Sequence, residues 1–214
     1  MGHRPATTFA TTFAAFAALC ALAAPAVAQD RLPPIAPDKY SDAQRKAAEE
    51  FAGGRGYEVR GPFVPLIRSP EVMLRAKAMG DHLRFKSVLA PRLSEMIILI
   101  TAREWTQQYE WVAHHDIAIK AGLRNDIADA IADGRRPVGM AEDEEAAYDM
   151  SIEIQRTKRV SDPTWNKAVA KFGEQGVIDL LGINGYYTFL AMAMNAARTG
   201  LPAGVAEPLK RFPD

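Results

Sequence analysis

Apolar residues recur at intervals of three and four along most of this chain, and this helical spacing constrains the fold more than any other feature. The segment after Ser69 shows the pattern clearly, because Pro70 suits the first helical position and Glu71 suits the first turn. The same pattern predicts helices over residues 41–52, 70–85, 92–105, 107–121, 124–133, 142–157, 161–172 and 174–198. We therefore predict an all-α fold built as one compact multi-helix domain.

One apolar run also suits a different secondary structure. Met96–Ile100 is an unbroken apolar stretch, and a stretch of this length can form a buried strand. We interpret it as part of a helix, because the pattern is helical on both sides and no partner strand is visible.

The residues before Ser69 interrupt the pattern. Residues 29–40 are rich in proline and predict an extended arm. Ser41 and Gln44 have the spacing of a capping box at the start of a short helix, which we expect to stop at Gly53-Gly54. Residues 53–69, rich in glycine and proline, predict a loop that serves as a lid or a subunit contact. We divide the chain into residues 1–28, residues 29–68 (arm, short helix and loop) and a helical domain over 69–214.

Residues 1–28 have the layout of a secretory signal peptide. His3 and Arg4 give a weakly basic start, a charge-free stretch follows, and Ala26-Val27-Ala28 forms the A-x-A pattern of a cleavage site. A membrane anchor and a lipoprotein anchor at Cys20 are the alternatives. We expect a secreted or periplasmic protein that does not contact the membrane after cleavage, since no later segment approaches about 18 apolar residues.

Composition excludes several functional classes. Cys20 is the one cysteine, so a disulfide scaffold, a cysteine zinc site and a CxxC redox centre are excluded within one chain. Lys plus Arg and Asp plus Glu both number 26, and this balance argues against binding to nucleic acid.

The segment 107–115 is the densest group of functional side chains. Gln107, Glu110 and His114 are spaced by three and four residues, so they point to one side of a helix. A carboxylate beside an imidazole suits general acid–base catalysis near neutral pH. Tyr109 and Trp111 flank this group and are candidates for the wall of a pocket. The alternative is a surface helix with a weak Glu–His pair.

Three further residues are candidates for a site. Glu95 shares a helical stripe with apolar residues, so it is either partly desolvated or a solvated residue near a helix start. Arg92 is a candidate for binding an anionic substrate, although a solvated arginine is the alternative. His115 is adjacent to His114, so the two rings point about 100° apart and do not easily share one metal ion. We therefore predict neither a metal nor another cofactor.

Several segments together resemble the carboxymuconolactone decarboxylase family, which includes the alkylhydroperoxidase D branch. They are Leu93–Leu99, Tyr109-Glu110-Trp111, His114 with Ala121-Gly122-Leu123, Val160–Trp165, and the segment from Tyr186-Tyr187 to Asn195. The resemblance covers about residues 69–200. It implies an all-α fold assembled as a trimer or hexamer, with the active site between helices near a subunit boundary.

The resemblance also assigns roles to particular residues. In the peroxidase branch a helix carries Cys-x-x-Cys-x-x-x-His and the preceding helix carries a glutamate. These positions correspond here to Gln107, Glu110, His114 and Glu95, so the proton-relay residues are present and both thiols are missing. Because the thiolate is the reacting atom in peroxide reduction, thiol peroxidase chemistry is excluded, even where that name is transferred by family.

We therefore predict a cofactor-free acid–base enzyme, similar to a carboxy-lyase, that acts on a small carboxylate or lactone. In this hypothesis His114 is the general acid or base, and Glu110 orients it or takes a second proton step. Glu95 tunes this group or relays a proton. A related hydrolase or isomerase is equally compatible with these residues. The alternatives from other classes are a non-catalytic oligomeric protein that binds a small hydrophobic acid and a metal-dependent enzyme.

Overall fold

The computed structural model describes residues 1–2 and 30–211, and this part of the chain contains α-helices, one short 3₁₀ helix (Pro37–Lys39) and no strand. The α-helices are α1 (Asp42–Arg55), α2 (Phe63–Leu66), α3 (Pro70–Phe85), α4 (Pro91–Glu104), α5 (Gln108–Lys120), α6 (Asn125–Ala132), α7 (Glu142–Thr157) and α8 (Asp162–Ala197). The prediction of an all-α fold is confirmed. The predicted signal peptide lies outside the described residues, apart from Met1 and Gly2.

The run Met96–Ile100 lies inside α4 and is buried throughout, so the helical interpretation is confirmed. Helix α4 packs against α5, α7 and α8, and is therefore apolar on most of its circumference. This all-round burial explains why the run resembles a buried strand in sequence.

The capping box at the start of α1 is present. The Ser41 hydroxyl accepts a hydrogen bond from the Gln44 backbone at 3.3 Å, and the Gln44 side chain accepts one from the Ser41 backbone at 2.9 Å. The predicted end at Gly53-Gly54 is wrong, because α1 continues to Arg55 and ends at Gly56 with a left-handed φ of 73°. Residues 53–69 are likewise not a simple loop, since they include the end of α1 and all of α2.

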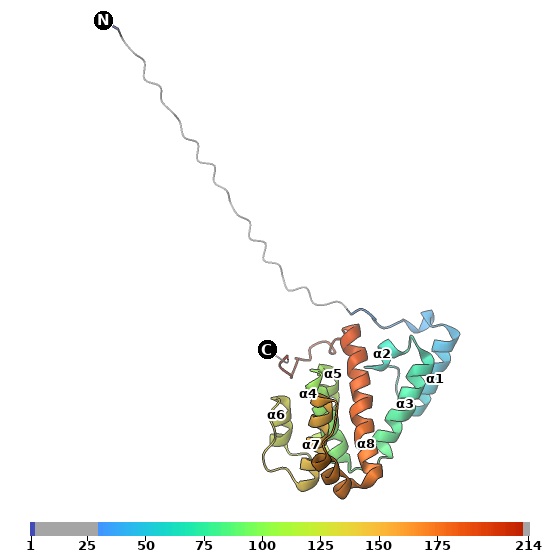
Figure 1. Ribbon diagram of the computed structural model, residues 1–214. Coiled ribbons are helices and arrows are strands. Elements are labelled where there is room, and N and C mark those ends of the chain that lie inside the picture. Colours follow the sequence, from blue (N-terminus) through green and yellow to red (C-terminus); the bar gives the residue numbers. More distant parts are fainter. Residues whose placement is uncertain (3–29, 212–214) are drawn as a thin grey trace.

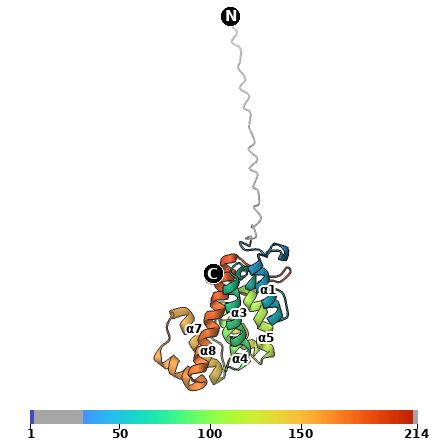
Figure 2. The same cartoon turned by 90° about the vertical axis from the view of Figure 1, so that its right-hand side faces the viewer.

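Helix α8 is the long central element of the fold. In Figure 1 it runs between α1, α2 and α3 on one side and α4 to α7 on the other, and it contacts α2, α3, α4 and α7. The predicted boundary between helices at residues 172–174 corresponds to a real break, because Gly173 has φ 69° and ψ 173° within this element. Figure 2 shows α3 and α8 running side by side.

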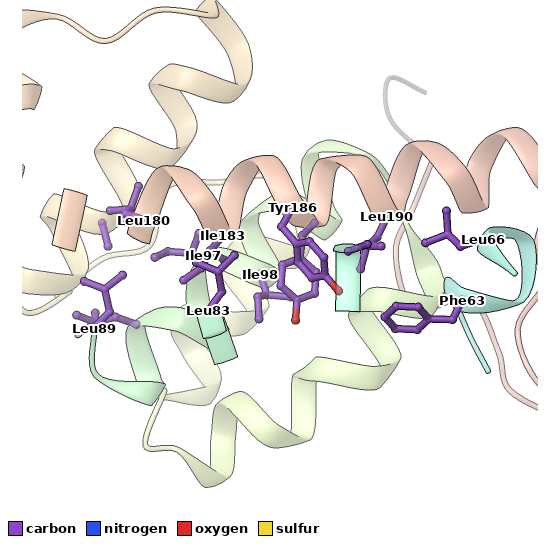
Figure 3. Close-up of a cluster of buried hydrophobic side chains, with 14 of the residues drawn as sticks. Phe63, Leu66, Leu83, Leu89, Ile97, Ile98, Leu180, Ile183, Tyr186 and Leu190 are labelled. Carbon is purple, nitrogen blue, oxygen red and sulfur yellow. The ribbon is translucent and has the colours of Figure 1, made fainter. Parts of the chain in front are cut away.

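Two buried clusters form the core. The larger one joins α8 to α1, α2, α3 and α4, and Figure 3 shows part of it. Its labelled members are Phe63, Leu66, Leu83, Leu89, Ile97, Ile98, Leu180, Ile183, Tyr186 and Leu190. The smaller cluster joins the other face of α4 to α5, α6 and α7, and includes Trp111 and Leu209. Helix α4 therefore lies between the two clusters and fixes α5 relative to α8.

By length and composition, α8 is apolar enough to cross a membrane, and it is the one such helix among the described residues. The expectation that no segment after residue 28 has this character is therefore wrong. In its most apolar window 56% of the residues are buried inside the protein, and core helices of soluble proteins pass the same test.

Candidate active site

A cavity of about 160 Å³ lies where α5 and α8 face the end of α1, the segment before α2 and the end of α3. An apolar cavity of about 150 Å³ holds a benzene molecule, so this volume suits a small organic ligand. The lining residues are Arg55, Tyr57, Arg60, Pro62, Phe63, Arg84, Tyr109, Glu110, Ala113, His114, Ile117, Tyr186, Tyr187 and Leu190.

The imidazole of His114 is held by a carboxylate from the neighbouring helix. Nδ1 of His114 lies 2.6 Å from Oε2 of Glu95, and both side chains are buried. With Glu95 ionised, Nδ1 carries the proton and donates it, so in the neutral ring Nε2 is the basic nitrogen. The ring also packs edge-on against Tyr187, with centroids 5.1 Å apart. His114 is thus fixed in orientation by two contacts.

Glu110 lies one helical turn before His114 and has a very different environment. Both of its carboxyl oxygens are buried without a hydrogen-bond partner in the described part of the chain. Burial raises the pKa of Glu110 well above the ordinary value of 4.5, because the charged form loses its hydration. Burial therefore favours the protonated form of Glu110, which lines the cavity as a potential proton donor.

Of the two carboxyl groups, Glu95 and not Glu110 contacts the imidazole of His114. Glu110 and His114 share one side of α5, as the spacing predicts, but no hydrogen bond joins them. Glu95 makes the bond that orients the ring, because α4 packs along α5 and places residue 95 beside residue 114.

Tyrosine side chains supply further polar groups to the cavity. Burial raises the pKa values of Tyr186 and Tyr187, and both hydroxyls remain protonated over the whole physiological range. Burial also raises the pKa of Tyr109, although the positive charge of Arg60 partly offsets this effect. These hydroxyls are therefore available to donate hydrogen bonds to a ligand.

The segment 57–63 closes one side of the cavity and acts as its cover. Gly61 has a left-handed φ of 58°, and a Cβ atom there would lie 2.6 Å from the ring of Tyr109. Only glycine permits both this backbone conformation and this close approach. The guanidinium of Arg60 stacks on Tyr57, with 3.8 Å between Cζ and the ring centroid. Gly61 thus sets the segment directly against α5.

Two residues predicted to bind substrate do not line the cavity. Trp111 is buried in the smaller core cluster, so its role is in packing. Gln107 is the N-cap of α5, where its side chain accepts a hydrogen bond from the Tyr109 backbone at 2.7 Å. Its amide nitrogen donates to Asn195 at 2.8 Å, which ties α5 to the end of α8.

The other two predicted binding residues also lie outside the cavity. His115 is half-buried and contacts Asp116 at 3.1 Å. Arg92 forms ion pairs with Asp143 and Glu144, which join α4 to the acidic first turn of α7. Both residues therefore contribute to the structure around the site and not to the wall of the cavity.

Sequence reasoning missed the basic and aromatic residues that α1, the segment 57–63, α3 and α8 bring to the cavity. The missed residues are Arg55, Tyr57, Arg60, Arg84, Tyr186 and Tyr187, although the last two had been noted as part of the family resemblance. In the sequence, Gly61 was the available signal for this side of the cavity, because it belongs to the segment 53–69 that we predicted to be a lid or a subunit contact. Within residues 1–2 and 30–211, no three His, Cys, Asp or Glu side chains form a group that could hold a metal ion.

The fold is shared with solved structures of low sequence identity. An uncharacterized peroxidase-related protein from Ralstonia eutropha JMP134, described as an alkylhydroperoxidase AhpD core, is 19% identical with a TM-score of 0.63, covering 78% of this chain and 88% of that one. The present chain therefore has the alkylhydroperoxidase D fold. A putative antioxidant defence protein AhpD from Agrobacterium tumefaciens is 14% identical with a TM-score of 0.57, covering 64% of this chain and 94% of that one.

A third protein with the alkylhydroperoxidase D fold has a different name. The debrominase Bmp8, in a structure with 2,3,4-tribromopyrrole, is 13% identical with a TM-score of 0.63, covering 80% of this chain and 91% of that one. No family model and no curated protein sequence matches this chain. Sequence identities this low establish a shared fold alone. The chemistry of this chain therefore depends on the residues that line its cavity.

Proposed function

We propose that this protein is a cofactor-free acid–base enzyme that acts on a small carboxylate or lactone, by decarboxylation or a related reaction. The observation that carries the proposal is the contrast between two neighbours on α5. Glu110 has no hydrogen-bond partner among the described residues and its pKa is raised by burial, whereas His114 is held by Glu95 and presents a basic nitrogen. A general acid and a general base thus line one cavity, and groups with opposed environments are typical of acid–base sites.

The proposed reaction needs proton transfers and no redox group. In a decarboxylation the C–C bond to the carboxylate breaks, CO₂ leaves, and its bonding electrons remain on the substrate as an enolate. Glu110 then donates its proton to the carbanionic carbon, and a proton from solvent, taken up at Nε2 of His114 and passed on, restores Glu110 for the next turnover. The hydroxyls of Tyr186 and Tyr187 stabilise the enolate oxygen by hydrogen bonding.

The absence of a thiol from the described residues supports this chemistry over peroxide reduction. The chain has one cysteine, Cys20, at a position before the predicted cleavage site. Gln107 and Glu110 stand at the positions that the resemblance assigns to the two thiols. Neither side chain supplies a thiolate, so a thiol peroxidase mechanism has no reacting atom in the cavity.

The test is turnover of a panel of γ-lactones and β-keto acids by the purified protein and two variants. We expect Glu110→Gln and His114→Gln each to lower kcat by at least about 100-fold, the usual contribution of a positioned acid or base. The matched control is His115→Gln, because this neighbouring histidine lies outside the cavity and pairs with Asp116.

The outcomes separate an enzyme from a binding protein. A wild-type protein that turns over no compound of the panel, or unchanged turnover by both cavity variants, would overturn the proposal. Binding without turnover would instead support a non-catalytic small-molecule-binding protein.

We also propose that the protein is exported and self-associates. Export is supported by the layout of residues 1–28, and its test is N-terminal sequencing of protein from the periplasm. Self-association is supported by exposed apolar side chains on α3 and α8, including Val72, Met79 and Met192. A second copy is the expected occupant of this face, and a monomeric mass in light scattering would exclude it.

A further inference from the structure

An arginine that has no carboxylate partner among the described residues lines the cavity. Arg84 lies in the last turn of α3, and its Nε is buried without a hydrogen-bond partner in the part of the chain that the structure describes. Its guanidinium contacts the ring of Phe85, with 5.1 Å between Cζ and the centroid. A buried N–H without an acceptor costs free energy, and an anionic ligand would satisfy it with a charge-assisted hydrogen bond.

The surroundings of Arg84 carry an excess of positive charge. Arg55 pairs with one oxygen of Asp81 at 2.7 Å, and Lys77 pairs with the other oxygen at 2.7 Å. One carboxylate therefore serves two cations. Arg60 adds a further positive charge from the covering segment, where it stacks on Tyr57. A cleft lined by charge of one sign attracts ligands of the opposite sign.

The acidic groups of the site offset this charge only in part. Burial raises the pKa of Glu110 and so favours its neutral form, and the carboxylate of Glu95 is bonded to His114 on the α5 side. The positive charge of Arg84 acts on the hydroxyls of both Tyr186 and Tyr187, so cation and hydroxyl donors face the same region of the cavity.

We propose, building on the proposed function, that Arg84 is a substrate-binding residue that holds a carboxylate of the substrate, with Arg55 and Arg60 contributing long-range attraction. The substrate is accordingly a small organic anion, with one ring or a short chain, and not an uncharged lactone. Its carboxylate lies at the α3 side, and its reacting carbon lies toward Glu110 and His114 on α5.

The test uses a pair of probes that match in shape and differ in charge. 2-Furoate and 2-furamide each consist of one five-membered ring with one small planar substituent. Calorimetric titrations of the wild-type protein at fixed pH and ionic strength should give a furoate affinity at least tenfold higher than the furamide affinity, or ~1.4 kcal/mol.

Three variants distinguish binding of charge from a loss of folding. Arg84→Gln should lose at least tenfold in furoate affinity and change less than twofold in furamide affinity. Arg75→Gln is the matched control, because Arg75 lies on the same helix, pairs with Glu71 and does not line the cavity. Arg84→Lys should retain part of the preference, since it keeps the charge but loses the planar fork.

Every outcome of these titrations either supports or overturns the proposed carboxylate-binding role of Arg84. Equal wild-type affinity for the two probes, binding of neither at millimolar concentration, or an Arg84→Gln variant with an unchanged preference would overturn the proposal. An equal loss for both probes would show a structural role and would overturn it as well. Glu110→Gln should bind furoate normally even though it blocks catalysis, so failure of the subsite and failure of the acid–base proposal give different results.

Discussion

Replacement of Glu110 by glutamine should make the protein more stable at neutral pH. The carboxyl group is buried with no hydrogen-bond partner in the described part of the chain, and burial raises its pKa well above 4.5. Below the unfolded-state pKa both states are protonated, and the group has no linkage effect on stability. As the pH rises above that value, the unfolded chain releases a proton that the folded protein retains. The wild type therefore loses stability until the pH passes the pKa of the folded state.

The magnitude follows from proton linkage alone. Each pH unit over which Glu110 stays protonated only in the folded state costs about 1.4 kcal/mol of unfolding free energy. Glutamine is neutral at every pH and nearly isosteric, so the variant does not have this slope. The difference between variant and wild type should thus be smallest below about pH 4.5, should grow by about 1.4 kcal/mol per pH unit above it, and should level off once the pH passes the pKa of the folded state.

The assay is urea denaturation at a series of pH values from 4 to 8, at one protein concentration. Unfolding free energies come from linear extrapolation, and unchanged m-values would show that the two states expose the same surface. Glu49→Gln provides the control, because Glu49 is an exposed glutamate of α1. It tests whether replacing any glutamate produces the effect.

Two results would refute this reasoning. The first is a constant difference between Glu110→Gln and the wild type across the pH range. The second is a wild-type advantage that grows with pH, which would mean that the charged carboxylate is stabilised in the folded protein.

Two further substitutions test the packing around the site. Gly61→Ala places a Cβ against the ring of Tyr109 at a left-handed φ, so it should cost about 1–3 kcal/mol in urea denaturation and displace the covering segment; wild-type stability and ligand affinity would contradict this. Trp111→Ala should cost about 3–5 kcal/mol, because the indole is buried in the smaller core cluster. A kcat change in any Trp111→Ala protein that remains folded would count against its purely structural role.

The helices were largely predictable because their signals are local. The spacing of apolar residues and the helix-start residues located α3 to α7 closely, and the capping box of Ser41 and Gln44 fixed the start of α1. The end of α1 was missed because two adjacent glycines usually terminate a helix, whereas here the left-handed residue is Gly56.

The candidate site was predictable only in part. Spacing identified Glu110 and His114 as residues on one side of one helix, and this side does face the cavity. The same reasoning placed Trp111 in the pocket wall, because periodicity does not show which of two neighbouring cores a side chain enters. Arg84 and Tyr186 lie about a hundred positions apart in the sequence, and no local pattern relates them.

The sequence by itself determined that this chain folds into helices and that its described part offers imidazole and carboxyl groups without a thiol. Only the tertiary structure decided which carboxyl group bonds to His114 and which one retains its proton. Helical periodicity is a property of neighbouring residues, but hydration and hydrogen bonding depend on what other helices place around a group. Glu95 and Glu110 have the same side chain, and their different surroundings in the folded protein give them different chemistry.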